Sequence, residues 1–333
     1  MAEFDLSPKP SDVKLEISRF LQFGRGAYGS LNADQAAEVD ACFERGLRLF
    51  LNPPPLPGEK HSHTWTFLRP TTTLTTSANY ETGTVSTSGS STTITLAGGT
   101  YPTWAAGAII VIDSTEYDVI TRSGDTAIVI DTALTLSAGT EYSLERHSYT
   151  LPDNFGGMVG NFIYRGGRTY PRGEVVNTST FERTRFASES GRQIGTPSLA
   201  SIEPIDSTDG TPDLPPRFKV VFYPRSNAVY EMYYTYIANI AIPANIGSDH
   251  GGLPGGQQHG ETLISACLAI AEEIMDEKTT VKMQQFMSRL AGSVSIDRRI
   301  HSPGNLGQNR DESDRLEIGR HPRSDYNVKY TGA

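Results

Sequence analysis

The sequence predicts an α+β fold in which helices from both ends of the chain form a bundle with a small antiparallel sheet, and an all-β domain, a barrel or sandwich, is inserted between them. Three observations support this prediction. Apolar residues recur at helical spacing near both ends, and a long Thr- and Ser-rich segment with short β-branched runs lies between them. The 333 residues also include 32 glycines and 20 prolines, which is typical of turn-rich β structure.

Two helices are expected near the start of the chain. In residues 11–23 the apolar residues with helical spacing are Val13, Ile17, Phe20 and Leu21. A second helix is expected over residues 32–52, because Asn32 and Gln35 have the spacing of a capping pair and prolines follow from Pro53. Two short antiparallel helices bury each other's apolar faces only in part, so they need a third helical partner.

That partner is predicted near the C-terminus. About 35 residues after Gly260 have a helical pattern, with a break near Thr279–Thr280. Their apolar stripe consists of Leu263, Cys267, Ile270, Ile274, Phe286, Leu290 and Val294. A helical core made from both ends of the chain would make the middle an insertion.

The segment from Thr71 to Tyr149 is the expected β insert. Of its 79 residues, 29 are Thr or Ser and none is Lys, and its eight acidic residues outnumber its two basic ones. Strands are predicted at residues 92–96, 108–112, 117–120 and 127–130. Turn residues such as Asp113–Ser114 separate them. Most of the excess negative charge of the chain therefore lies on this insert.

A second β region is expected after the insert. Residues 218–223 and 229–236 read as the two strands of a hairpin joined by a Pro/Ser/Asn turn, and residues 198–205 as an edge strand. A short helix is expected over residues 180–188. The predicted division of the chain is 1–70 for the N-terminal helices, 71–149 for the insert, 150–300 for the small sheet and the long C-terminal helix, and 301–333 for an extended tail.

The tail is polar and cannot bury enough apolar surface to become ordered alone, so we expect another chain to order it. The residues expected to contact a partner, either a neighbouring subunit or a second protein, are the scattered apolar ones. These are Leu306, Leu316, Ile318, Tyr326, Val328 and Tyr330.

Composition argues against several classes of protein. A net charge of −9 and a pI near 5.3 disfavour a strong general affinity for nucleic acid. No apolar run is long enough to span a membrane, and residues 1–5 lack the features of a signal peptide. Cys42 and Cys267 lie in helical patterns and are expected to be buried thiols.

No motif predicts catalysis, a cofactor or a metal. Residues 24–29 spell a dinucleotide-binding fingerprint, but a helix precedes them instead of a strand, so we interpret them as a helix end and turn. His61 and His63 lack a third zinc ligand at suitable spacing, since Asp249–His250 and His259 are distant, and they are expected to be ordinary exposed histidines. The paired carboxylates Glu272–Glu273 and Asp311–Glu312 are interpreted as solvated.

The order of these segments resembles the head-to-tail adaptor (connector, or head-completion) proteins of tailed bacteriophages. The resemblance rests on packing and turn signatures over residues 10–300. These are Asp40–Phe50 running into prolines, Trp65–Pro70, the Thr-rich insert ending at Tyr149–Gly156, the Phe222–Tyr–Pro turn, the tyrosine-rich strand, and Glu261–Leu268 in the closing helix.

The resemblance implies a structural virion protein without enzymatic activity. Such proteins form a homo-oligomeric ring, usually of twelve copies, beneath the portal protein in the neck of the virion. The ring is assembled in the host cytoplasm, sits above a tail or nozzle protein, has no membrane contact, and lets DNA pass without sequence-specific binding. An acidic channel lining would let duplex DNA pass without sticking.

Three alternatives stay open at the level of sequence. The first is another ring of the virion, such as a gatekeeper or nozzle ring of a short tail. The second is a carbohydrate-binding β protein, for which Trp104 would supply a stacking platform, although a tryptophan packed on a core is the more common situation. The third is an unrelated enzyme.

Overall fold

The structure is a computed structural model that describes residues 8–23, 30–165, 172–187, 193–205, 216–240, 253–276 and 281–300. Within these residues it contains five α-helices and several antiparallel sheets, which confirms the mixed α+β class. The chain divides into two compact units. The first joins residues 1–69 to 240–309, and the second is built around residues 70–239.

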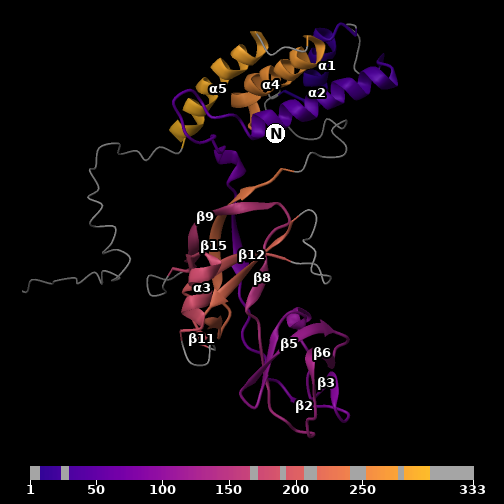
Figure 1. The fold of residues 1–333 in the computed structure, drawn as a ribbon, viewed down its shortest axis with the longest axis vertical. Helices are drawn as coiled ribbons and strands as arrows, with labels where there is room; N and C mark the ends of the chain where they lie inside the picture. The colour runs from indigo at the N-terminus through magenta and orange to yellow at the C-terminus, as the bar shows by residue number, and fades with distance from the viewer. Residues whose placement is uncertain are drawn as a thin grey trace, which may run out of the picture. The chain divides into compact units, whose positions relative to one another are not determined.

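The first unit is helical and draws on both ends of the chain (Figure 1). Its helices are α1 (Pro10–Phe20), α2 (Ala33–Leu51), α4 (Gly256–Asp276) and α5 (Val281–Ile300). The predicted capping pair is confirmed, because the Asn32 side chain accepts from the Gln35 amide at 2.8 Å. The expected break at residues 279–280 lies outside the described residues.

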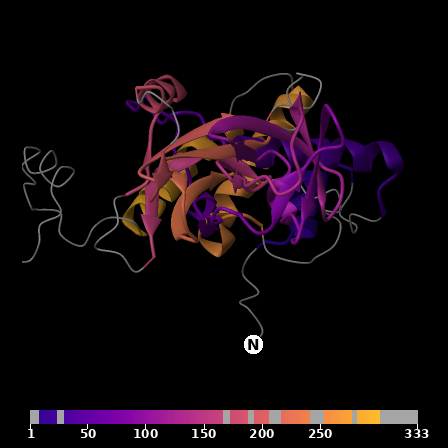
Figure 2. The ribbon, with the colours of Figure 1, turned by 90° about the horizontal axis from the view of Figure 1, so that it is seen from below.

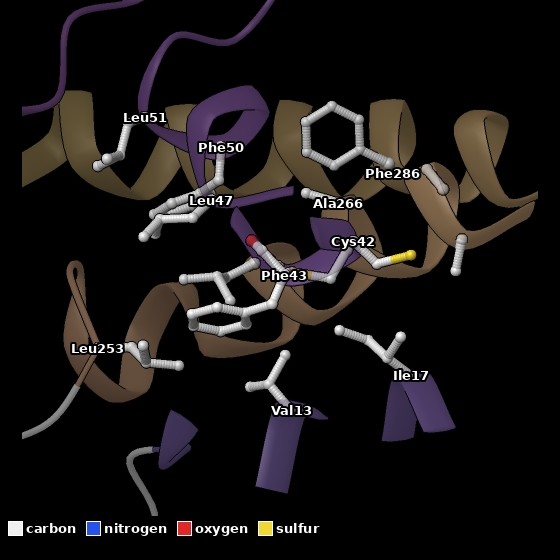
Figure 3. Packing of buried hydrophobic residues seen from close by; sticks show 14 of the residues in the cluster. Val13, Ile17, Cys42, Phe43, Leu47, Phe50, Leu51, Leu253, Ala266 and Phe286 are labelled. Atoms are coloured by element: carbon white, nitrogen blue, oxygen red, sulfur yellow. Dashed lines mark hydrogen bonds between the residues drawn. The ribbon is translucent and has the colours of Figure 1, made fainter. Parts of the chain in front are cut away.

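One hydrophobic cluster contains side chains from all four helices, and Figure 3 shows Val13 and Ile17 of α1, Phe43 of α2, and Phe286 of α5 within it. All four side chains are fully buried. Helices α2 and α4 approach closely at Gly46, where an added Cβ would lie 2.5 Å from the Cα of Cys267. Both cysteines are buried free thiols, as predicted. The apolar stripes predicted near the two ends of the sequence therefore bury one another.

Within the second unit, six strands form one curled sheet in the order β2-β3-β6-β5-β4-β7 (Figure 1). The strands are β2 (Thr84–Ser86), β3 (Ser91–Ala97), β4 (Ile109–Ile112), β5 (Thr115–Arg122), β6 (Ala127–Leu134) and β7 (Ser143–Glu145). Isolated bridges from Tyr80 to Leu144 and from Val85 to Thr140 bring the two edges of the sheet together. The sheet therefore curls into a half-barrel around its own apolar cluster, which includes Ile110.

The predicted turn between two of these strands is present. Asp113 and Ser114 connect β4 to β5, and both have positive φ angles, 49° and 65°. Two consecutive left-handed residues match the right-handed twist of a tight hairpin, and Asp tolerates this conformation better than most residues do.

The rest of the second unit contains two larger sheets and a two-stranded pair. The sheets have the orders β1-β15-β9 and β10-β12-β13-β8, and β11 pairs with β14. The strands are β1 (Thr71–Thr75), β8 (Ser148–Thr150), β9 (Phe155–Tyr164), β10 (Glu174–Val175), β11 (Ile194–Gly195), β12 (Leu199–Pro204), β13 (Phe218–Tyr223), β14 (Arg225–Ser226) and β15 (Glu231–Ala238). The inner faces of the two larger sheets share one aromatic-rich cluster that includes Phe162, Phe222 and Tyr234.

The short helix expected near residue 180 is α3 (Thr178–Arg185). Its Phe181 is fully buried and packs with Val221 and Tyr223 of β13. Since Val220 and Phe222 of the same strand belong to the inner cluster, α3 covers the outer face of this sheet. Figure 2 shows α3 on the outside of these strands.

The predicted hairpin between residues 218–223 and 229–236 is wrong. Both segments are strands, but β13 pairs with β12 and β8, whereas β15 pairs with β1 and β9. The connection contains β14, which pairs with β11, so the chain crosses from one sheet to the other instead of turning back on itself. Alternating aromatic residues indicate that one face of a strand is covered. They do not indicate which strand pairs with its edge.

The units also divide the chain differently from the sequence-based scheme. The ends of the expected insert, β1 and β8, pair with β15 and β13 instead of joining the curled sheet. The strands up to Ala238 share a core with them, so residues 150–239 group with the insert. The segment predicted as an edge strand, β12, lies inside its sheet, between β10 and β13.

The shared helical core predicts a steep cost for truncating a central side chain. Phe286→Ala should lower the free energy of unfolding by about 3–5 kcal/mol, because it removes a fully buried ring from the cluster. Val281→Ala, on the same helix but 57% exposed, is the control and should change it by less than about 0.5 kcal/mol. Equal values for the two variants in urea unfolding would contradict the assigned core.

Candidate functional site

The first unit contains a cluster of histidine, aspartate and aromatic side chains, which we call the His–Asp cluster. It consists of His63, Trp65, Thr66, His259 and Asp297. Prolines follow the end of α2, and the chain then passes through residues 56–65 to a short 3-10 helix, η2 (Thr66–Leu68). Trp65 is fully buried and donates its indole N–H to the Phe50 carbonyl at 2.7 Å, which fixes this segment against α2.

Asp297 is the centre of the cluster, on the last turns of α5. Its side chain is 1% exposed, and its Oδ2 lies 2.7 Å from His63 Nε2. The same oxygen accepts the Thr66 amide at 3.1 Å, and its Oδ1 accepts the Thr66 hydroxyl. A buried carboxylate with three hydrogen bonds is fully satisfied, so these contacts tie residues 63–66 to a helix more than 200 residues away.

His259 approaches the cluster from α4. Its imidazole is 3% exposed and lies 5.0 Å from the Trp65 ring and 5.9 Å from the Phe67 ring. Its Nδ1 has no hydrogen-bond partner in the described structure. The ring therefore packs mainly as an aromatic group.

The environment shifts two pKa values in this cluster. Burial raises the pKa of Asp297, but the hydrogen bonds from Thr66 and His63 outweigh it and hold the pKa below its usual range. Burial lowers the pKa of His259 below its ordinary value, and the charge of Asp297 offsets this only in part. The cluster thus favours a charged carboxylate beside a neutral His259.

These contacts hold the segment that follows α2 against the end of α5. Thr66 donates its hydroxyl to Asp297, a carboxylate whose lowered pKa makes it a weak base. Next to it, Arg298 forms a two-pronged pair with Glu59, both contacts 2.7 Å long. Residues 59–66 are therefore held at two consecutive positions on the end of α5, where the chain continues into the tail.

The second unit contains a buried charge network. Arg225 of β14 is 4% exposed and contacts Glu116 of β5 and Glu145 of β7, at 2.8 and 2.9 Å. Glu145 is fully buried. Burial lowers the pKa of Arg225, but the hydrogen bonds and charges of both carboxylates outweigh it and raise the pKa above its usual value. The network links the curled sheet to the β11–β14 pair.

The histidine prediction needs correction. His61 is exposed, as expected, but His63 is largely buried and contacts Asp297, and His259 is buried beside the Trp65 ring. Within the described residues, no group of three or more His, Cys, Asp or Glu side chains is arranged to hold a metal ion. Asp249 and His250 lie outside the described residues.

The structure also shows where two other candidate residues of the sequence analysis, Glu272 and Trp104, lie. Glu272 is not solvated: it is 6% exposed and accepts the Lys282 amide at 2.9 Å, at the start of α5. Trp104 is half-buried and packs against the core of the curled sheet. Several predicted residues lie outside the described part of the chain, namely residues 24–29, Asp311, Glu312, Leu306, Leu316, Ile318, Tyr326, Val328 and Tyr330.

Sequence reasoning did not find Asp297, Arg225 or their partners. His63 and Asp297 are 234 residues apart, and Arg225 and Glu116 are 109 apart, so no local spacing connects them. The useful signal was a charged residue inside an apolar pattern. Arg225 follows the buried end of β13 after a single proline, and Asp297 lies within α5, three residues after Val294 of its apolar stripe.

Comparison with protein-family models and with curated proteins finds no match to this chain.

The His–Asp cluster predicts a pH dependence of folding. Because the pKa of His259 is lowered in the folded state, only the unfolded chain gains a full proton as the pH falls below about 6.5. The free energy of unfolding should therefore decrease from pH 7.5 to 5, with a slope of at most about 1.4 kcal/mol per pH unit from this group. Asp297 remains ionised over this range, because its pKa is lowered as well.

The measurement needs a probe of the first unit alone, because burial also lowers the pKa of His147, in the second unit, to about 4. The chain has two tryptophans, so Trp104→Phe leaves Trp65 as the reporter. In this background His259→Leu should lose part of the pH slope, and the exposed control His61→Leu should keep it. An unchanged slope in His259→Leu would exclude His259 as its source.

The charge network predicts a large loss on removing its cation. Arg225→Met should lower the free energy of unfolding of the second unit by about 3–5 kcal/mol, because it removes the cation that pairs with the fully buried carboxylate of Glu145 and with the partly exposed one of Glu116. Arg225→Met/Glu145→Gln should recover part of this loss. Arg165→Met, which breaks a solvent-exposed pair with Glu231, is the control and should have little effect. The measurement is chemical unfolding in a Trp65→Phe background, in which Trp104 is the remaining fluorescent reporter. Equal free energies of unfolding for Arg225→Met and Arg165→Met would contradict the network.

Proposed function

We propose that this chain is a structural virion protein of the head-to-tail adaptor type. In this proposal identical copies form a ring, of about twelve, that joins the portal of a phage head to the tail and lets DNA pass. The four helices α1, α2, α4 and α5 are the adaptor bundle, and the β region is an elaboration inserted into it. The protein has no enzymatic role and no resident cofactor, and it works in the neck of the virion after assembly in the host cytoplasm.

The observation that carries the proposal is the single core built by residues 13–68 and 253–294. A chain whose two ends close one helical unit can carry a large insertion between them, which is the order of segments in the adaptor proteins it resembles. The unit ends with α5, and a 33-residue polar tail follows it in the sequence. A tail of that composition needs a partner to become ordered, and in an adaptor that partner is the portal or a neighbouring subunit.

Charge supports passage of DNA without retention. Each copy carries a net charge of −9, and a ring repeats that charge around its axis. Within the β insert, exposed carboxylates such as Asp113, Asp118 and Asp131 outnumber the basic residues. Phosphates would find few cations there that could replace their counterions. Among the described helices, none is long and apolar enough to cross a membrane.

A gatekeeper or nozzle ring of a short tail is the closest alternative, since it has the same need for repeated surfaces. The two differ in the partner of the tail, because only a portal-bound ring has its tail protected by portal protein. The carbohydrate-binding alternative depends on Trp104. The packing of this side chain against the curled sheet reduces the ring face available to a sugar, so we do not propose it.

The proposal predicts a closed oligomer that binds portal. Native mass spectrometry of the full chain, with electron microscopy of the same sample, should give rings of about twelve copies, alone or after portal is added. Portal should also protect the tail from trypsin at Arg310, Arg315 and Arg320. A chain deleted after His301 should keep the helical circular dichroism signal but lose portal binding.

Two outcomes would contradict the proposal. One is a chain that stays monomeric with portal at every concentration tested. The other is tight, salt-sensitive retention of duplex DNA by the isolated protein in an electrophoretic assay, which would contradict the non-retaining channel. Quenching of tryptophan fluorescence by polysaccharide would instead favour the carbohydrate-binding alternative.

A further inference from the structure

Strand β1 has an open edge. Within the described residues it pairs with β15 on one side and is the terminal strand of its sheet. Its sequence, Thr-Thr-Thr-Leu-Thr, contains no charged residue, and Pro70 precedes the strand instead of interrupting it. Natural proteins usually protect such an edge with charge, proline or a covering segment, because it offers backbone groups to any extended chain.

The register shows which backbone groups are available. The Tyr236 amide donates to the Pro70 carbonyl and the Thr76 amide to the Tyr230 carbonyl, so even-numbered residues of this segment face β15. The N–H and C=O groups of Thr71, Thr73 and Thr75 therefore point away from the sheet. All three residues are exposed. The edge thus presents three donors and three acceptors, enough for a strand of about five residues.

The chain itself contains a segment that fits this edge. Residues 326–330, Tyr-Asn-Val-Lys-Tyr, alternate large apolar and polar side chains, as a strand with one buried face does. They lie outside the described residues, beyond the end of α5 at Ile300. The 25 residues between them and α5 reach up to roughly 80 Å when extended, at about 3.3 Å per residue. This is long enough to reach another subunit.

The side chains of this segment also match the two faces of the sheet. Leu74 of β1 is 8% exposed and belongs to the aromatic cluster on the inner face, while Thr71, Thr73 and Thr75 lie on the outer face. A strand added with its apolar residues on the side of Leu74 extends that cluster with Tyr326, Val328 and Tyr330. Asn327 and Lys329 then remain in water.

We propose that residues 326–330 of one copy add as a strand to the β1 edge of a second copy. This inference rests on the proposed ring, and it identifies a contact between neighbouring copies that would close that ring. Every copy has one open edge and one tail, and a head-to-tail contact of this kind repeats around an axis until the ring is complete. Main-chain hydrogen bonds supply the affinity, and the alternating side chains supply the register.

Cross-linking between single-cysteine additions tests the contact directly. Thr73→Cys in one full-length chain is mixed with Val328→Cys in another that carries a mass tag, and a short thiol cross-linker is added. The native Cys42 and Cys267 are buried and unreactive by comparison. We expect at least ten times more tagged–untagged dimer than in the control, in which the untagged chain carries Thr95→Cys instead of Thr73→Cys. Thr95 is also an exposed threonine, but on the interior strand β3.

Two outcomes would overturn the inference. One is no heterodimer above the Thr95→Cys control. The other is a link that forms only when Thr73→Cys and Val328→Cys are in the same chain, which would place the tail on its own subunit.

A proline scan at the edge provides a second readout. Thr73→Pro removes an outward N–H that β15 does not use, and proline is tolerated at such positions, whereas Thr73→Val keeps the N–H. Trypsin should cut the tail at Arg323 and Lys329 at least tenfold faster in the assembled Thr73→Pro protein than in Thr73→Val. Should Thr73→Pro not fold, Val328→Pro makes the same test from the tail. Equal cleavage rates would overturn the inference.

Native mass separates this inference from the proposed function. Rings without the cross-link would leave the adaptor proposal standing and overturn the tail contact. Cross-linked dimers or open chains that never close would support the tail contact and contradict the ring.

Discussion

The apolar face of α2 can be buried only if the two ends of the chain meet, and this requirement organises the helical unit. Helix α2 contributes Phe43, Leu47 and Phe50 to the core, and α1 alone is too short to cover them. Helix α4 completes the cover, and Gly46 lets its backbone come within contact of α2 at Cys267. Because burial of apolar surface is the main driving force of folding, the residues between must leave and return without opening this core.

Buried charges hold connecting segments in both units, and the principle is the same in each. Asp297 receives three hydrogen bonds from residues 63–66, and Arg225 lies between two carboxylates. Charge inside a protein is costly unless it is paired and hydrogen-bonded, so each group tolerates few alternative arrangements of its neighbours. These side chains therefore specify where a loop or short strand lies, while the apolar clusters supply most of the stability.

The sequence predicted local structure better than pairing. Helices, caps and most strands follow from side-chain periodicity and from pairs such as Asn32 and Gln35, which act over a few residues. The pairing of β13 and β15 was predicted wrongly, since period-two patterns show that a strand has a buried face without showing what covers it. The His–Asp cluster was missed for a related reason, because His63 and Asp297 are neighbours only through the fold. The tail residues that carry the partner prediction lie beyond the described part.

The pairing of β1 with β15 has an evolutionary consequence. The chain enters the second unit at Pro70 and leaves it after Ala238, and these two points lie on adjacent antiparallel strands, with Pro70 bonded to Tyr236. A segment whose entrance and exit are neighbours behaves as a cassette, because a short turn joining the same two points replaces it. Recombination could therefore add, exchange or remove such a cassette without altering the helical core, because the two points that join it to the rest of the chain stay in place.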